Sequence, residues 1–385
     1  MIGLKLLFRN AFRHKLRTYL TIFGITVAIL AFGLLRTVVD AWYAGVEASA
    51  ANRLVARNAI SLTFSLPIAY REKIKSVSGV DEVSYGNWFA GIYIEEKNFF
   101  ANFAVDPKTY LEIYPEFVVP PEEKTDFLKD RKAAVAGVKL MERFGWKIGD
   151  TVMLKGTIFP GDWDFTIRGI YSGRDKNTDE SQFFSHWDYL NERLKDREPM
   201  RADQAGFFLI KVADPDSAAG IAVEIDKLFK NSLAETLTET ERAFQMSFVS
   251  MTEAIMVAIQ LVSFVVIIII MAVMANTMGM SVRERMGEYA VFKTLGFGGG
   301  YIGMLIFGES AVITASGCLL GILLTYPAAD LFTSQLGQFF PVFIIKTATI
   351  YLDILAALAV AIIAAIIPAY RAVTVSITDA LRRVG

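Results

Sequence analysis

Long apolar runs separated by polar segments dominate the chain. Four of them are long enough to form membrane-spanning helices, because each covers the ~30 Å hydrocarbon core at ~1.5 Å per helical residue. The predicted spans are residues 19–42, 252–280, 301–326 and 351–370. The polar segment between the first two spans, residues 43–247, is too long for a simple connection, and we expect it to fold as a domain.

This inserted segment mixes helix and strand patterns. The expected helices are Tyr70–Val77 and a segment that starts at Asp214-Pro215 and runs to Phe229, and the expected strands are Val80–Tyr85, Gly91–Glu95 and Gly206–Val212. These elements predict a small α/β unit made from two separated pieces of chain. A helical pattern over residues 222–248 predicts that the domain continues directly into the second span.

Between those two pieces lies a mainly β segment. It has a helical pattern at Ala134–Phe144, followed by expected strands at Thr151–Lys155 and Asp164–Ile170. The charged run after Pro120-Pro121 is predicted to be a solvated connector, and residues 173–180 a mobile loop. The predicted fold class is a four-helix membrane protein with an α+β domain of two subdomains inserted between its first and second helices.

Charge sets the predicted orientation. Positive residues lie before the first span, between spans two and three, and after the last span, and such segments are typically cytoplasmic. They include Arg13, Arg17, Arg283, Arg285, Lys293 and Arg371. Residues 43–247, with 26 Lys and Arg against 32 Asp and Glu, and the short loop 327–350 are expected outside. This distribution gives no basic face for nucleic acid.

The N-terminal residues 1–18 predict an amphipathic helix on the cytoplasmic membrane surface. A cleavable signal peptide is the alternative, because Ala48-Ser49-Ala50 resembles a cleavage site. The apolar run that precedes it is too long for a typical signal peptide, which favours a retained span.

The chain lacks the residues of common catalytic and metal sites. It has one cysteine, Cys318, and its two histidines, His14 and His186, are expected on opposite sides of the membrane. The glycines of residues 296–300 lack the Lys-Ser/Thr of a phosphate-binding loop. We therefore predict no catalytic residue, no metal site and no cofactor, and we interpret Gly296–Gly300 as a hinge.

The segment 281–297 is the most informative polar stretch, since it leaves the second span, turns and forms a short charged helix. Its charged residues are Arg283, Glu284, Arg285, Glu288 and Lys293. A solvated surface helix has the same composition. Its order of residues, however, resembles the coupling helix of MacB/FtsX-type ABC transporter permeases: Ser281-Val282, Glu284-Arg285, then Glu288-Tyr289-Ala290, then Lys293 to Gly296.

Other segments carry the same resemblance. Asn10–Gly24 is similar to the family's first membrane helix, Phe307, Glu309, Gly317 and Gly321 to its third, and Pro368–Ala372 with Asp379–Arg382 to its C-terminal end. Ala290 stands where the family usually has Gly, and Ile377 where it usually has Pro. Residues 371–385 are expected as a cytoplasmic tail.

The resemblance implies a multi-pass permease of the bacterial inner membrane whose ATP is bound by a separate ATPase dimer. It implies a second permease copy, contact with membrane lipids and, in Gram-negative relatives, a periplasmic adaptor and an outer-membrane channel. The implied activity is export of a peptide, antibiotic, lipid or lipoprotein from the periplasmic side. The alternative is a regulatory scaffold that activates a cell-wall hydrolase.

Two features inside the third span have both a structural and a functional interpretation. Glu309 is ionisable within the membrane, and pairing with segment 281–297 is favoured over a proton relay. Gly317 and Gly321 form a GxxxG pattern that allows close helix packing and is interpreted as a contact between two copies.

Overall fold

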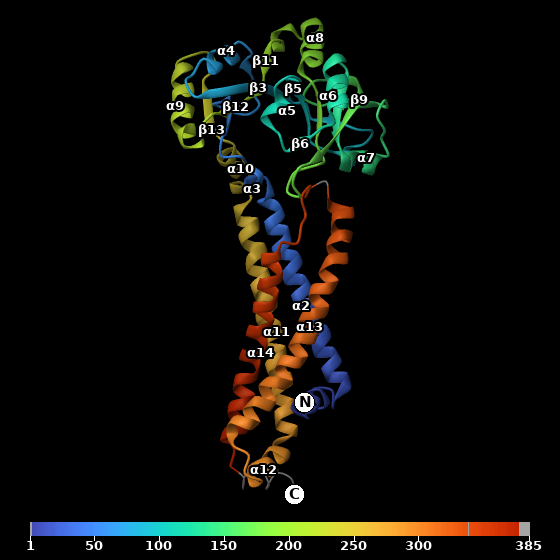
Figure 1. Ribbon diagram of the computed structural model, residues 1–385, viewed down its shortest axis with the longest axis vertical. Coiled ribbons are helices and arrows are strands. Elements are labelled where there is room, and N and C mark those ends of the chain that lie inside the picture. Colours follow the sequence, from blue (N-terminus) through green and yellow to red (C-terminus); the bar gives the residue numbers. More distant parts are fainter. Residues whose placement is uncertain (1, 338, 377–385) are drawn as a thin grey trace. The chain divides into compact units, whose positions relative to one another are not determined.

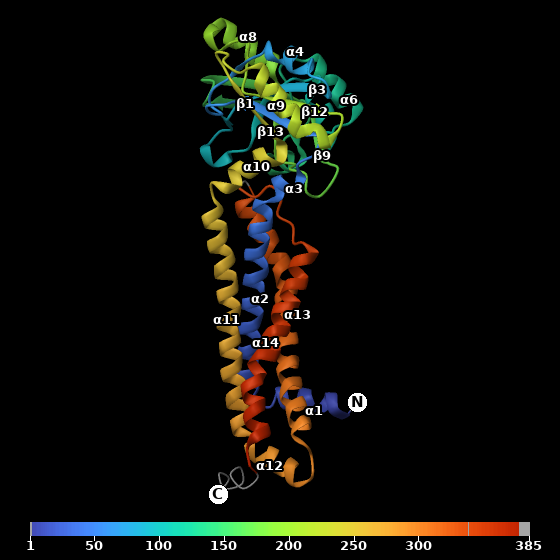
Figure 2. The ribbon, with the colours of Figure 1, turned by 90° about the vertical axis from the view of Figure 1, so that its left-hand side faces the viewer.

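The computed structural model describes residues 2–337 and 339–376, and for residues 2–6 only the backbone. Four helices in this part are long and apolar enough to cross a membrane: α2 (Lys15–Trp42), α11 (Glu253–Glu284), α13 (Gly299–Leu336) and α14 (Thr347–Thr374). They run side by side in both ribbon views (Figures 1 and 2). Contacts divide the chain into a bundle, residues 1–41, 253–335 and 343–385, and a domain, residues 42–252 with 336–342.

The bundle places its apolar side chains in two environments. Inward residues such as Ile25, Met274 and Ile306 are buried between helices. Others on α11, such as Leu261 and Phe264, remain 61% and 63% exposed. Because lipid chains are as apolar as leucine, such an exposed apolar surface is what a membrane-embedded helix requires.

The helix ends differ from the predicted boundaries. Helix α11 continues to Glu284, so residues 281–284 belong to the span helix, and only α12 (Met286–Thr294) is a separate short helix. Helix α13 continues through Pro327 to Leu336 because a proline is tolerated inside a membrane helix. At the N-terminus, α1 (Ile2–Ala11) ends before α2 begins at Lys15. The C-terminal motif Asp379–Arg382 lies outside the described residues.

The inserted domain is built on one mixed sheet. Its strand order is β13-β1-β12-β3-β5-β10-β7-β9-β8-β4, and β6 pairs with β9. The strand bounds are β1 Arg53–Asn58, β3 Val80–Trp88, β4 Gly91–Ile92, β5 Asn102–Val105, β6 Phe117–Val118, β7 Ala133–Gly137, β8 Thr151–Gly156, β9 Gly161–Gly173, β10 Phe183–His186, β12 Phe207–Val212 and β13 Thr236–Thr240. A separate pair joins β2 (Leu66–Pro67) and β11 (Gln204–Ala205). The predicted mixed domain between the first two spans is confirmed.

Helices cover this sheet over separate apolar cores. One core lies at the β1, β3 and β12 end and includes Ile74, Phe208 and Ile225. Another lies in the middle segment of the domain, residues 89–203 between β3 and β11, and includes Phe89, Trp163 and Leu190. Pairing of β3 with β5 joins the two parts into one sheet. The helices are α3 Ala44–Ala48, α4 Tyr70–Lys75, α5 Tyr110–Ile113, α6 Pro121–Lys129, α7 Val138–Phe144, α8 Trp187–Arg197, α9 Ala218–Leu228 and α10 Glu241–Ser250.

Three sequence predictions for the domain are wrong. Residues 134–137 form strand β7, whose small apolar side chains are buried between β10 and β9. The charged connector is helix α6, which begins with Pro121 and buries Phe127. The predicted continuous helix 222–248 is interrupted by β13, since Thr236 and Thr238 bond Asp226 and extend the sheet.

Candidate functional site: an ion-pair cluster among the membrane helices

The segment with the most informative sequence forms a corner between two helices. Arg285 lies between the end of α11 and the start of α12. Tyr289 and Ala290 are buried, so α12 packs one side against the bundle. Gly296 ends this segment in the left-handed conformation, at φ 90°. The corner is therefore a packed part of the bundle and not a loop in solvent.

Arg285 is the buried centre of the corner. Its Nη1 lies 2.7 Å from Oε2 of Glu309 on α13, and its Nε lies 3.1 Å from Oε2 of Glu288 on α12. The Ser281 hydroxyl donates a second hydrogen bond to Glu309, at 3.1 Å. Burial alone lowers the pKa of Arg285, but Tyr289, Glu309 and Glu288 together raise it above its usual value. Arg285 thus carries its charge between two carboxylates.

Glu288 connects this centre to the N-terminal segment. Its Oε1 accepts a hydrogen bond from Arg13, in the short stretch between α1 and α2. Burial opposes ionisation of Glu288, but the bonds from Arg13 and Arg285 outweigh it and lower the pKa of Glu288. One carboxylate therefore bridges two arginines from segments more than 270 residues apart in the chain.

A second ion pair lies beside the first. Arg17 donates two hydrogen bonds to Glu284, at 2.7 and 3.0 Å, in a bidentate arrangement. His14 Nε2 is 3.3 Å from the same carboxylate. These contacts join the start of α2 to the end of α11.

Lys293 joins the other end of α12 to α14. Its Nζ donates hydrogen bonds to the carbonyl oxygens of Val373 and Val375, at 2.8 and 2.6 Å. These carbonyls lie at the C-terminal end of α14, where a positive charge is favourable. Arg283 is exposed and has no ion pair within the described residues.

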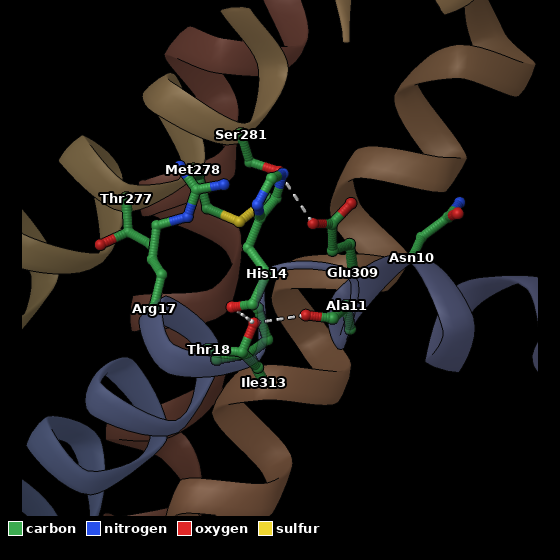
Figure 3. Close-up of a pocket in the computed structure, with 10 residues that line it drawn as sticks. All are labelled: Asn10, Ala11, His14, Arg17, Thr18, Thr277, Met278, Ser281, Glu309 and Ile313. Atoms are coloured by element: carbon green, nitrogen blue, oxygen red, sulfur yellow. Dashed lines mark hydrogen bonds between the residues drawn. The ribbon is translucent and has the colours of Figure 1, made fainter. Parts of the chain in front are cut away.

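A small cavity lies beside the cluster (Figure 3). It has a volume of about 10 Å³ and is lined by polar groups of His14, Arg17, Ser281 and Glu309. This is room for about one water molecule. The cavity therefore does not accommodate a larger ligand. In the described part of the chain no three His, Cys, Asp or Glu side chains gather as a metal site.

Gly317 and Gly321 lie inside the bundle. A Cβ on Gly317 would approach Ile25 to 2.7 Å, and one on Gly321 would approach Ile29 to 2.8 Å, both on α2. Close helix packing is thus their role within one chain. Because α2 covers this face, the interpretation as a contact between two copies is withdrawn.

The sequence interpretation missed several members of the site. It treated Arg13 and Arg17 only as orientation signals, although their two positive charges balance the two negative charges of Glu288 and Glu284. Outside this cluster it also missed Asp353 on α14, which is 2% exposed and whose Oδ1 has no hydrogen-bond partner among the described residues. A single carboxylate in an apolar run is the signal that would have found it.

Two family models match the chain. The model described as MacB-like periplasmic core domain matches residues 18–228, and that described as FtsX-like permease C-terminal matches residues 260–377. The second match contains α12 and both partners of the Arg285–Glu309 pair.

Similar proteins include a curated relative and solved structures of extracellular or permease domains. An uncharacterized ABC transporter permease of Methanocaldococcus jannaschii is 25% identical over 342 residues, which cover 82% of this chain and 81% of the relative. The extracellular domain of the noncanonic ABC-type transporter YknZ from Gram-positive bacteria is 16% identical, with a TM-score of 0.36, and covers 49% of this chain and 99% of that one. A domain of a putative permease from Porphyromonas gingivalis is 12% identical, with a TM-score of 0.32, and covers 49% and 88%.

Proposed function

Since this chain belongs to the FtsX/MacB family of ABC transporter permeases, we propose that it couples ATP hydrolysis by a separate ATPase subunit to movement of its inserted domain. The supporting observation is the way in which α12 is held. This helix follows α11 directly, binds α13 through Arg285 and Glu309, and binds α14 through Lys293. Glu288 adds the segment before α2.

A short helix held in this way transmits force efficiently. A push on a flexible loop would be absorbed by rotation about its backbone, whereas a push on α12 reaches all four spans through packed and ion-paired contacts. Arg283, in the last turn of α11, is exposed and has no ion pair among the described residues, so its charge is available to a partner. We propose that the ATPase docks there, on the cytoplasmic side, as the flanking positive charges indicate.

The proposed assembly contains two permease copies and an ATPase dimer in the cytoplasmic membrane, with both termini inside. The domain between α2 and α11 then works outside, on a peptide, antibiotic, lipid or lipoprotein, with an adaptor and outer-membrane channel where the cell has them. The family and the charge pattern support this proposed placement. A regulatory scaffold that activates a cell-wall hydrolase would use the same coupling site and differ only in the partner of the domain.

Hydrolysis by the partner ATPase tests the proposal. A candidate ABC ATPase partner is reconstituted with the full-length chain in lipid nanodiscs, and its rate is compared with that of the ATPase alone. We expect the rate to depend on the permease, and the double variant Arg285→Ala/Glu288→Ala to remove that dependence. The control variant Lys132→Ala breaks an exposed ion pair with Asp164 in the inserted domain. The ATPase rate is expected to remain dependent on the permease in this control. A rate that ignores the permease would refute the proposal.

A further inference from the structure

A buried ion cluster lies where both membrane-connected helices enter the inserted domain. Arg53 and Glu241 are 4% and 5% exposed. Arg53 begins β1, five residues after α3, and Glu241 is the first residue of α10. By chain continuity α3 follows α2 and α10 precedes α11, so this cluster lies at the domain ends of the first and second membrane segments.

Glu241 binds the two membrane-connected segments together. Its Oε2 accepts hydrogen bonds from Arg53 Nε at 2.7 Å and from the Ala50 backbone N–H at 2.9 Å. The two segments are also in contact at a second place. Trp42 Nε1, at the end of α2, donates a hydrogen bond of 2.8 Å to the hydroxyl of Thr252, which lies between α10 and α11. The cluster thus adds a charged contact to a helix pair that is already packed.

Arg53 extends the same contact to the middle segment of the domain. Its two terminal nitrogens lie 2.6 and 2.9 Å from the two oxygens of Glu116, and Nη1 also donates to the Ile113 carbonyl at 3.2 Å. The guanidinium group stacks on Tyr114, 4.3 Å from the ring centre. The Tyr114 hydroxyl donates to Glu241 at 3.0 Å, and burial together with the Glu241 charge raises the pKa of Tyr114, which keeps it a donor.

We propose that Arg53, Tyr114, Glu116 and Glu241 form a clamp that joins both membrane-connected helices to the middle segment of the domain, so that these three parts move as one body. The proposal rests on the proposed function, because a clamp matters only if the spans move. Arg53 is a positioning residue in this account. One guanidinium group suits this role because its planar fork holds two carboxylates at once, which a lysine cannot do.

Removal of one partner from this cluster is expected to be costly. Arg53 is buried between two carboxylates, and breaking such a cluster leaves an uncompensated buried charge. A neighbouring pair offers a comparison, because Arg57 on β1 and Glu239 on β13 lie 3.1 Å apart without an ion pair to the middle segment. Disruption of that pair removes an Arg–Glu ion pair that is only partly buried and leaves the clamp intact.

Spin-label distances in the full-length permease in nanodiscs test the clamp. The native cysteine is replaced by Cys318→Ala, and labels are attached at Ala48→Cys and Met246→Cys, on α3 and α10, or at Ala48→Cys and Met200→Cys, where Met200 is an exposed residue of the middle segment. Labelled copies are diluted with unlabelled ones so that each distance is within one chain. We expect a single narrow distribution for both pairs.

The variants separate the two halves of the clamp. Glu116→Ala and Arg53→Lys are expected to broaden the 48–200 distance and to leave the 48–246 distance narrow, because the contact with Glu241 remains. Glu241→Gln is expected to broaden the distribution of the 48–246 distance. The control Arg57→Gln is expected to broaden neither distribution. A general loss of stability would broaden both pairs in every variant. The clamp is refuted if Glu116→Ala and Glu241→Gln give the distributions of Arg57→Gln.

These distances require no nucleotide, so they remain informative if the ATPase does not respond to the permease. In that case the proposed function fails while the clamp is still decided by the labels. Conversely, clamp variants are expected to retain permease-dependent hydrolysis, because none of the clamp residues takes part in the ion pairs that hold α12.

Discussion

Arg285 and Glu309 form a buried ion pair, with 2.7 Å between Nη1 and Oε2, that connects the corner before α12 to the third membrane span. Both side chains are at most 6% exposed. A buried pair of this kind contributes little net stability over an apolar replacement, although loss of one partner is costly. In this chain the pair holds the corner before α12 against α13 in one defined orientation.

Stability and coupling are therefore expected to separate at this pair. Arg285→Met alone leaves Glu309 buried without its cation and lowers the free energy of unfolding by about 3–5 kcal/mol. Arg285→Met/Glu309→Leu regains most of this stability, since two apolar side chains replace the pair, but does not regain permease-dependent hydrolysis. Thermal melting and ATPase rates of the same preparations measure both effects. Recovery of hydrolysis in the double variant would show that the charges are not required.

The ion pairs of Glu288 predict a defined pH dependence. The pKa of Glu288 is lowered in the folded protein from its usual value of 4.5. The stabilisation of the folded state by the ionised carboxylate is therefore fully present above about pH 4.5 and is lost as the pH falls through the lower pKa of the folded protein. Wild type is expected to melt at a higher temperature than Glu288→Gln at pH 7, and the difference is expected to vanish in acid. A difference that persists or grows on acidification would contradict this assignment.

Gly317 is expected to tolerate no side chain. In Gly317→Ala the new Cβ meets Ile25 at 2.7 Å and the Ile22 carbonyl at 3.0 Å, so α2 and α13 must separate. Overpacking of this kind costs about 1–3 kcal/mol. Gly303→Ala, on the same helix with nothing within 4 Å, is the matched control. Equal melting temperatures of the two variants would contradict the close packing of α2 on α13.

Neutralisation of two carboxylates inside the membrane helices is expected to change the melting temperature differently. Glu309→Gln removes the charged partner of Arg285 and lowers the melting temperature. Asp353→Asn breaks no ion pair within the described residues, because Oδ1 has no partner and Oδ2 faces Gly33. Its melting temperature is therefore expected to stay at or above that of wild type. A fall equal to that of Glu309→Gln would reveal a cationic partner for Asp353.

The spans and the domain insertion could be predicted because they depend on composition summed over about 20 residues. Helix ends could not be predicted in the same way. The end of α11 depends on Arg285 reaching Glu309, a contact over 24 positions that no local pattern contains. In the domain, residues 134–137 were predicted to be helical, because small apolar residues occur in both helices and buried strands. Their pairing with β10 and β9, which are distant in the sequence, makes them a strand.

The candidate site was predicted in its residue types but not in its geometry. Arg283 to Lys293 were recognised from their order in the sequence. Their partners Arg13 and Arg17 lie more than 260 residues earlier in the chain. Opposite charges in two distant segments do not specify a pair until the helices are packed.

Site-specific photo-cross-linking tests the central claim most directly. A photoreactive amino acid replaces Arg283, an exposed residue next to the corner, or Ser334, an exposed residue near the C-terminal end of α13. Membranes that contain the permease and its ATPase are irradiated, and products are identified by mass spectrometry. The account predicts a cross-link to the ATPase from position 283 and none from position 334. A cross-link from position 334 alone, or from neither, would contradict it.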